Sequence, residues 1–148
     1  MHLRKHTVWG IIFILFLLPK LYALTWQAET FFQIKGIRFK EDRVVLPLSR
    51  NKYNDIRVLD QQTFSQLKNC QTVEICSQNL TKIDVKIENV RSIKEFFLVD
   101  VNLGDRWLVA FVVLKNGKDF MIKPPTRFKF LSNVFKEEVE RAIRQGIK

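Results

Sequence analysis

The sequence predicts an α+β domain, a mainly antiparallel sheet of about five to seven strands with a short helix and a C-terminal helix packed on it. Three observations indicate this class. Apolar and polar residues alternate along several segments, which is the period of a half-buried strand. Turns that contain glycine or asparagine separate these segments. The C-terminal segment instead repeats its apolar residues every three or four positions, as an amphipathic helix does.

The N-terminus has the layout of a secretory signal peptide. Two basic residues precede the apolar run Val8–Leu18, and Ala23 offers a small residue at a cleavage point. The run is shorter than the roughly 20 residues that a membrane-spanning helix needs. We therefore expect a signal peptide at residues 1–23 and one compact domain at residues 24–148. The alternative is an uncleaved anchor that keeps this run in the membrane.

The first half of the predicted domain contains a hairpin, a short strand and a short helix. Residues 29–48 place apolar runs on both sides of a polar turn and predict the hairpin. Residues 56–59 predict the short strand. Asp60 is a suitable N-cap for a helix over residues 61–69. The inward positions of this helix are Phe64 and Leu67.

The second half of the domain shows clearer strand patterns. Residues 82–88 alternate strictly, and residues 95–103 follow with the same period. Residues 107–114 are apolar at every position, which favours a central strand covered on both faces. Asn116-Gly117 is typical of a type I′ turn, because both residues tolerate a positive φ.

Two strands and a helix complete the chain. Residues 119–123 return from the Asn-Gly turn, and residues 127–131 predict a short last strand. Ser132 is an N-cap, and the helix that follows ends near Gln145, with Gly146 as its C-cap. Its apolar residues form one stripe that should lie on the sheet. They are Phe135, Val139, Ala142 and Ile143.

Export decides the compartment and the charge of the domain. We expect a periplasmic or secreted bacterial protein or, if the leader is retained, a periplasmic domain anchored in the inner membrane. Thiols oxidise in these compartments. The leader holds three of the 25 Lys and Arg residues and none of the 15 Asp and Glu, so residues 24–148 carry 22 cations against 15 acids, a net charge of +7.

The distribution of histidine excludes several classes of enzyme. His2 and His6 both lie in the leader, so the predicted mature domain has none. Ser-His-Asp and Cys-His catalysis and imidazole ligands for metals are therefore excluded. The carboxylates are scattered, two Ser-x-x-Lys matches lack the elements that complete such a site, and residues 100–105 lack the later ligands of a calcium loop. The sequence predicts a non-enzymatic protein with no cofactor and no metal.

The only two cysteines, Cys70 and Cys76, follow the short helix with five residues between them. A thiol–disulfide enzyme usually has two residues between its cysteines, at the start of a helix. Zinc would need further Cys or His ligands, which residues 24–148 do not contain. A disulfide here would close a loop of about seven residues and stabilise the domain by about 2 kcal/mol on the chain-entropy model. We therefore predict a structural disulfide and an exposed loop.

The segment before the C-terminal helix interleaves cations with aromatic residues. Arg127 and Lys129 lie on one face of the predicted strand, and Phe128 and Phe130 lie on the other. One interpretation is an edge strand whose charges prevent aggregation. The other is a binding surface for an anionic envelope partner, such as phospholipid headgroups, lipopolysaccharide or an acidic protein patch. Export disfavours nucleic acid as the partner. Glu74, in the disulfide loop, is a further candidate binding residue.

These observations favour an exported, non-enzymatic interaction module of the bacterial envelope, such as an accessory component of a secretion or pilus-type assembly. Its partner would be a protein or an anionic envelope surface, and an uncleaved leader would add association with the membrane. The alternative is a carrier of a small apolar ligand or lipid, with aromatic residues around a cavity. A third hypothesis is a secreted enzyme inhibitor that uses the loop at residues 49–55 or the loop at residues 70–76.

Overall fold

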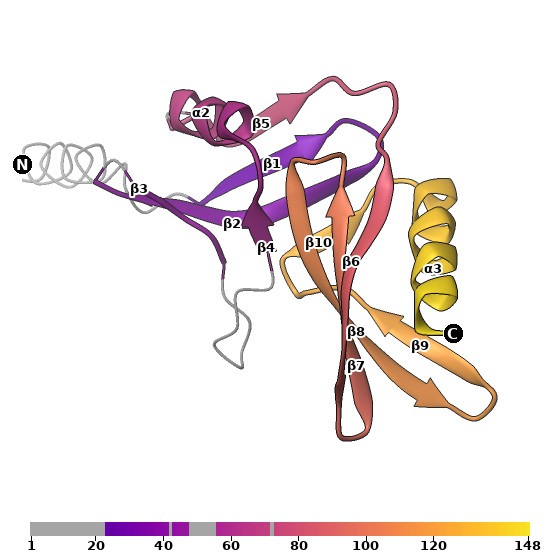
Figure 1. Ribbon diagram of the computed structural model, residues 1–148. Coiled ribbons are helices and arrows are strands. Elements are labelled where there is room, and N and C mark those ends of the chain that lie inside the picture. Colours follow the sequence, from indigo (N-terminus) through magenta and orange to yellow (C-terminus); the bar gives the residue numbers. More distant parts are fainter. Residues whose placement is uncertain (1–22, 42, 48–55, 72) are drawn as a thin grey trace, which may run out of the picture.

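The computed structural model describes residues 23–41, 43–47, 56–71 and 73–148. The predicted leader up to residue 22 and the loop at residues 49–55 lie outside the described residues. The described chain forms two five-stranded sheets, a short helix α2 and a C-terminal helix α3 (Figure 1). The predicted α+β class is confirmed, although the described residues form ten strands rather than five to seven. In this part of the chain no helix is long and apolar enough to cross a membrane.

The first sheet has the strand order β10-β2-β1-β5, and β3 pairs with the remaining length of β2. β2 and β3 form the predicted hairpin, and Lys40 lies opposite Arg43 next to its turn. The β1–β5 pair is parallel and the other pairs of this sheet are antiparallel. The strands are β1 (Leu24–Ala28), β2 (Phe32–Lys40), β3 (Arg43–Val45), β5 (Ile75–Gln78) and β10 (Phe128–Phe130).

One face of the first sheet is buried and the other is mostly polar. Trp26 lies opposite Ile34, which in turn lies opposite Phe128, and all three side chains are buried. The side chains of Gln27 and Gln33 point outward, because successive side chains of a strand lie on opposite faces. We call these the inner and the outer face of the sheet.

A bulge at Gly36 keeps the hydrophobic residues of β2 on the inner face. From Trp26 to Leu24, the paired residue of β2 advances from Ile34 to Ile37, so β2 accommodates one extra residue. Gly36 lies in this step with φ +79°, a backbone conformation that favours glycine. Without the extra residue, strict alternation would turn Ile37 outward and the basic residues after it inward.

Two strands of the first sheet, β1 and β5, lie outside the segments that the sequence pattern predicted as strands. β1 has a clear period of two, with Leu24, Trp26 and Ala28 buried, but it is short and directly follows the predicted leader. β5 has only one buried side chain, that of Cys76. Neither length nor periodicity therefore distinguishes β5 from a loop.

The second sheet has the strand order β4-β8-β7-β6, and β9 pairs with the remaining length of β8. β6 starts at Val85 rather than Lys82 and continues beyond the predicted end, because a bulge beside Glu88 returns Val90 to the inner face. All pairs are antiparallel. The strands are β4 (Ile56–Val58), β6 (Val85–Ile93), β7 (Phe96–Leu103), β8 (Trp107–Asn116) and β9 (Asp119–Lys123).

β8 is the central strand of this sheet, but only its inner face is fully buried. The buried residues are Trp107, Val109, Phe111 and Val113. The residues between them, on the outer face, are half-buried: Leu108, Ala110, Val112 and Leu114. The prediction that this strand is covered on both faces is therefore wrong for the part of the molecule that the structure describes.

The turn between β8 and β9 differs in detail from the predicted one. Asn116 pairs with Asp119, so the two turn residues are Gly117 and Lys118. Of these four residues, only Gly117 has a positive φ. The hairpin is confirmed, but its turn is displaced by one residue and is not of type I′.

Both helices begin at their predicted N-caps. Asp60 accepts a hydrogen bond from the backbone N–H of Thr63 at the start of α2 (Gln61–Asn69), and Ser132 accepts one from Phe135 at the start of α3 (Asn133–Ile147). α3 lies beside β6 (Figure 1). It buries the predicted stripe through Phe135, Val139 and Ile143.

Gly146 lies within α3 and is not the C-cap that the sequence predicted. A Cβ atom at this position would lie 3.3 Å from two atoms of the Ile87 side chain. Glycine here therefore allows the last turn of α3 to pack closely against β6.

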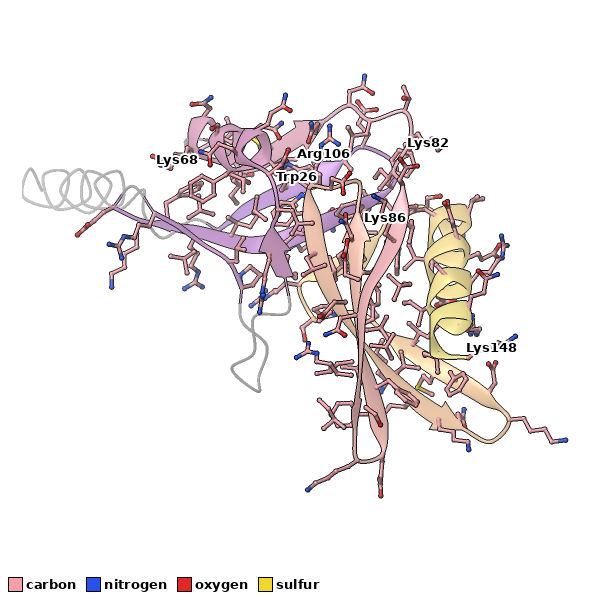
Figure 2. All side chains as sticks on the ribbon, in the orientation of Figure 1. Trp26, Lys68, Lys82, Lys86, Arg106 and Lys148 are labelled. Carbon is pink, nitrogen blue, oxygen red and sulfur yellow. A yellow bond between two sulfur atoms is a disulfide. The ribbon has the colours of Figure 1, made fainter. Side chains whose placement is uncertain are left out.

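The two sheets pack through their inner faces, where aromatic rings meet. The ring centroids of Trp26 and Trp107 are 5.1 Å apart, and those of Phe111 and Phe128 are 5.6 Å apart. The Nε1–H of Trp26 also donates a hydrogen bond to Oε1 of Gln66 in α2, at 3.2 Å. Figure 2 shows Trp26 close to α2, near the ends of the second-sheet strands. Trp26 therefore links both sheets and α2.

The predicted disulfide joins Cys70 and Cys76. Cys70 is the C-cap of α2, and Cys76 is buried in β5 rather than exposed in a loop. The Nε2–H of Gln66 donates to the backbone oxygen of Ser77, on the side of β5 that does not pair with β1. The disulfide and this hydrogen bond together hold α2 against the edge of the first sheet.

Removing the disulfide should destabilise the domain without changing its fold. We expect Cys70→Ala/Cys76→Ala to lower the free energy of unfolding by about 2 kcal/mol, because the unfolded chain regains the entropy that the short loop had restricted. Urea denaturation followed by circular dichroism measures this change. The wild-type protein in excess reductant should behave like the double variant. An unchanged midpoint in reductant would contradict a structural role.

Replacing Gly36 should strain the bulge of β2. Alanine at φ +79° should lower the free energy of unfolding by about 1–3 kcal/mol. Gln33→Ala, on the outer face of the same strand, is the control and should stay within about 0.5 kcal/mol of wild type. Equal stability of the two variants would show that the bulge does not need glycine.

Candidate functional site

The described residues offer no arrangement suited to metal binding. No group of three or more Cys, Asp or Glu side chains converges in the described part of the chain. The pKa of Asp119 is lowered, because the backbone N–H of Phe120 donates to its carboxylate and Arg144 lies nearby. This carboxylate lies next to the exposed β8–β9 turn and accepts a hydrogen bond from the residue that follows it. The candidate sites described next are surfaces of the described residues.

The disulfide loop presents two apolar side chains to solvent. Val73 is 48% exposed and Ile75 is 55% exposed, and Glu74 between them is exposed as well. The backbone oxygen of Glu74 accepts a hydrogen bond from Thr25, which fixes this part of the loop to β1. The predicted binding residue Glu74 is thus accessible, between two exposed apolar side chains.

The structure separates the basic from the aromatic side chains of residues 127–130, the segment that contains β10. Phe128 is buried and Phe130 is packed against the core, whereas Arg127 and Lys129 are exposed. A surface here therefore consists of the two cations without the aromatic rings. Lys129 lies opposite Gln33, and the backbone oxygen of Arg127 accepts a hydrogen bond from Lys35.

These two cations belong to a larger basic surface on the outer face of the first sheet. After the bulge at Gly36, alternation places Arg38 and Lys40 on the same face as Lys35. Arg43 lies opposite Lys40 in the β2–β3 hairpin. All of these side chains are exposed. We call this surface the basic strip, and its residues are Lys35, Arg38, Lys40, Arg43, Arg127 and Lys129.

A second surface covers the outer face of the second sheet. The strand register brings Phe96 beside Leu114, and Leu114 beside Met121. In the next row, Leu98 lies beside Val112. We call this surface the outer apolar face, and its residues are Ile93, Phe96, Leu98, Leu108, Ala110, Val112, Leu114 and Met121.

The outer apolar face is separate from the core. None of its eight residues is fully buried, and none belongs to the core or to the partly buried residues that pack against it. Cations line its margins: Lys123 lies beside Val112, and Arg57 lies beside Leu108. Arg91 lies beside Leu98 and is paired with Asp100 at 3.2 Å. Contiguous apolar surface with a polar margin is typical of an interaction site.

A groove lies where the β2–β3 hairpin, β4 and α2 meet. Its volume is about 470 Å³, and it is open to the surface. Arg43 and Arg57 place positive charge on walls that are otherwise apolar. The lining residues are Arg43, Val44, Val45, Leu46, Ile56, Arg57, Val58 and Phe64.

Sequence reasoning found part of these surfaces and missed the rest. It identified Arg127 and Lys129, but the four strip residues of β2 and β3 depend on a bulge that periodicity does not reveal. The continuous apolar run of β8 was a usable signal for the outer apolar face, because such a run places apolar side chains on both faces of a strand. The pattern could not show that one of these faces lies outside the core.

Comparison of the chain with protein-family models, with curated proteins and with solved structures finds no match.

Proposed function

We propose that this protein is an exported, non-enzymatic interaction module of the bacterial envelope, and that it binds a partner protein through the outer apolar face. The observation that supports this proposal is the set of eight contiguous apolar side chains that do not pack against the core. An accessory role in a secretion or pilus-type assembly would require such a surface. The apolar leader of the sequence supports export.

The dimensions of the outer apolar face suit a protein partner. The apolar side chains extend along β8 from Leu108 to Leu114, over roughly 20 Å at about 3.4 Å per residue. They extend across four strands, over roughly 14 Å at about 4.8 Å spacing, only at the end of the sheet that carries Phe96 and Met121, because Asp100 and Asn102 occupy the outer face of β7 beside Ala110 and Leu108. The apolar residues would form the centre of an interface, and the surrounding polar and charged residues would supply the rest of the roughly 800 Å² that each partner buries in a standard interface. The face is also built on paired strands, so binding would order little additional backbone.

The charges on its margins favour a partner other than a second copy. In a symmetric pair of sheets, Arg57, Lys123 and the other marginal cations of one copy would approach those of the other copy. Like charges in an interface are unfavourable. A partner with apolar residues flanked by carboxylates could cover the outer apolar face and form ion pairs with these cations.

Site-specific photo-crosslinking in the producing cells tests this proposal. We expect a photoreactive amino acid at Met121, which is 43% exposed on this face, to give one discrete adduct with another envelope protein. The same amino acid at Gln33, on the outer face of the first sheet, is the control and should not give that adduct. Mass spectrometry identifies the protein that is captured.

A variant of the face should remove the adduct without unfolding the domain. Leu98→Asn with Val112→Thr makes two half-buried positions polar, so stability should change by only about 0.5 kcal/mol per site. The adduct should be lost. An adduct that survives this variant, or that contains a second copy of the chain, would contradict a partner protein at this face.

A second candidate function, a carrier of a small apolar ligand, is favoured by the groove between the β2–β3 hairpin, β4 and α2. Its apolar walls and its two arginines suit a small anionic amphiphile.

Native mass spectrometry of the protein as isolated from cells tests the carrier function. We expect a bound small molecule whose occupancy falls in Arg57→Gln and not in Arg91→Gln, because only Arg57 lines the groove. A protein that is free of ligand, or equal occupancy in both variants, would exclude this function for the groove.

A further inference from the structure

The basic strip is a charged surface that the proposed protein partner does not use. Its six cations lie on the first sheet, whereas the outer apolar face belongs to the second. None of the six forms an ion pair with a residue in the described ranges. Like charges gathered in this way repel one another unless an anionic partner neutralises them. The strip therefore indicates an anionic partner.

The shape of the strip suits a flat partner. Lys35, Arg38 and Lys40 lie along one strand that rises about 3.3 Å per residue, so they extend over roughly 17 Å. Arg43 lies in β3, Lys129 lies in β10 and Arg127 directly precedes β10. Both strands pair with β2. Several of these side chains can reach a planar anionic surface at the same time.

The strip lacks the features that hold single-stranded nucleic acid. Proteins of that kind stack bases on exposed aromatic rings. Here Phe32, Phe39 and Phe128 lie on the inner face of the strands that carry the strip, in the core or packed against it. The uncharged side chains on the outer face contain no aromatic ring and so form no stacking platform; they are Thr25, Gln27, Gln33, Val45, Ile75 and Ser77.

The chain path brings the strip close to the predicted leader. Leu24 pairs with Ile37, so the chain enters the first sheet beside the half of β2 that carries Arg38 and Lys40. Five residues separate the apolar run Val8–Leu18 from β1, and five residues span at most about 18 Å. Whenever that run lies in a membrane, the strip lies within reach of its headgroups.

We propose that the basic strip binds the headgroups of anionic phospholipids at a bilayer surface. The first sheet would then lie on the membrane through its outer face. Because the two sheets pack through their inner faces, the outer apolar face points away from the shared core and stays available to a protein. This inference uses a different surface from the proposed function, so either can fail without the other.

Co-sedimentation with lipid vesicles tests the inference, with the protein in the form isolated from cells. We expect binding to vesicles in which about a third of the lipid is phosphatidylglycerol, little binding to pure phosphatidylcholine, and a decrease with added salt. Arg38→Gln/Lys40→Gln/Lys129→Gln removes three strip cations. At about fivefold per cation, the partition coefficient should fall on the order of 100-fold.

A matched variant separates the strip from net charge. Lys118→Gln/Lys136→Gln/Lys148→Gln lowers the charge by the same amount at exposed positions outside the strip. Figure 2 shows Lys148 at the C-terminal end of α3, on the opposite side of the view from β3. This control should bind within about fivefold of wild type.

Several results would overturn the inference. If both triple variants lower the vesicle partition coefficient equally, binding depends only on the net charge of the protein. If all variants bind vesicles to the same extent at every salt concentration and lipid charge, the leader and not the strip would be responsible for vesicle binding. Tighter binding of a single-stranded oligonucleotide than of the anionic vesicles, lost in the strip variant, would make nucleic acid the partner. The crosslink from Met121 should survive in the strip variant, and its loss there would show that the two surfaces are not independent.

Discussion

The contact between Trp26 and Trp107 is the interaction on which the rest of the structure depends. The two rings come from different sheets, and their centroids lie 5.1 Å apart in the centre of the core. The indole N–H of Trp26 also donates a hydrogen bond to Gln66, whose side chain in turn donates one to the backbone of β5. One side chain therefore fixes both sheets and α2 relative to one another, and the disulfide holds the end of α2 in the same place.

This arrangement gives each sheet one inner face and one outer face, and the two outer faces differ in chemistry. The outer face of the first sheet carries the basic strip, and the outer face of the second is apolar. The core needs only the inner faces, so neither outer surface follows from the requirements of packing. Exposed apolar surface lowers solubility and gathered like charges repel one another unless a partner covers them, so both surfaces favour the binding of partners.

Bulges decide which residues reach these surfaces. A strand with strict alternation that placed Ile34 inward would also place Arg38 inward, and the extra residue at Gly36 reverses this. The bulge beside Glu88 in β6 likewise returns Val90 to the core. The sequence pattern identified most strands and both N-caps, because alternation and capping are local. It missed β5, whose single buried residue, Cys76, is recognisable only from its contacts with β1 and α2.

The sequence by itself determined the α+β class, the β2–β3 and β8–β9 hairpins, the caps at Asp60 and Ser132, and the pairing of the only two cysteines. Each of these depends on neighbouring residues or on simple counting. Only the tertiary structure decided that the strands divide into two sheets and that the outer face of β8 lies outside the core. It also joined Arg127 and Lys129 to the cations of β2 and β3. The physical reason is that these features depend on pairing between strands distant in sequence, and periodicity within one strand carries no information about its neighbours.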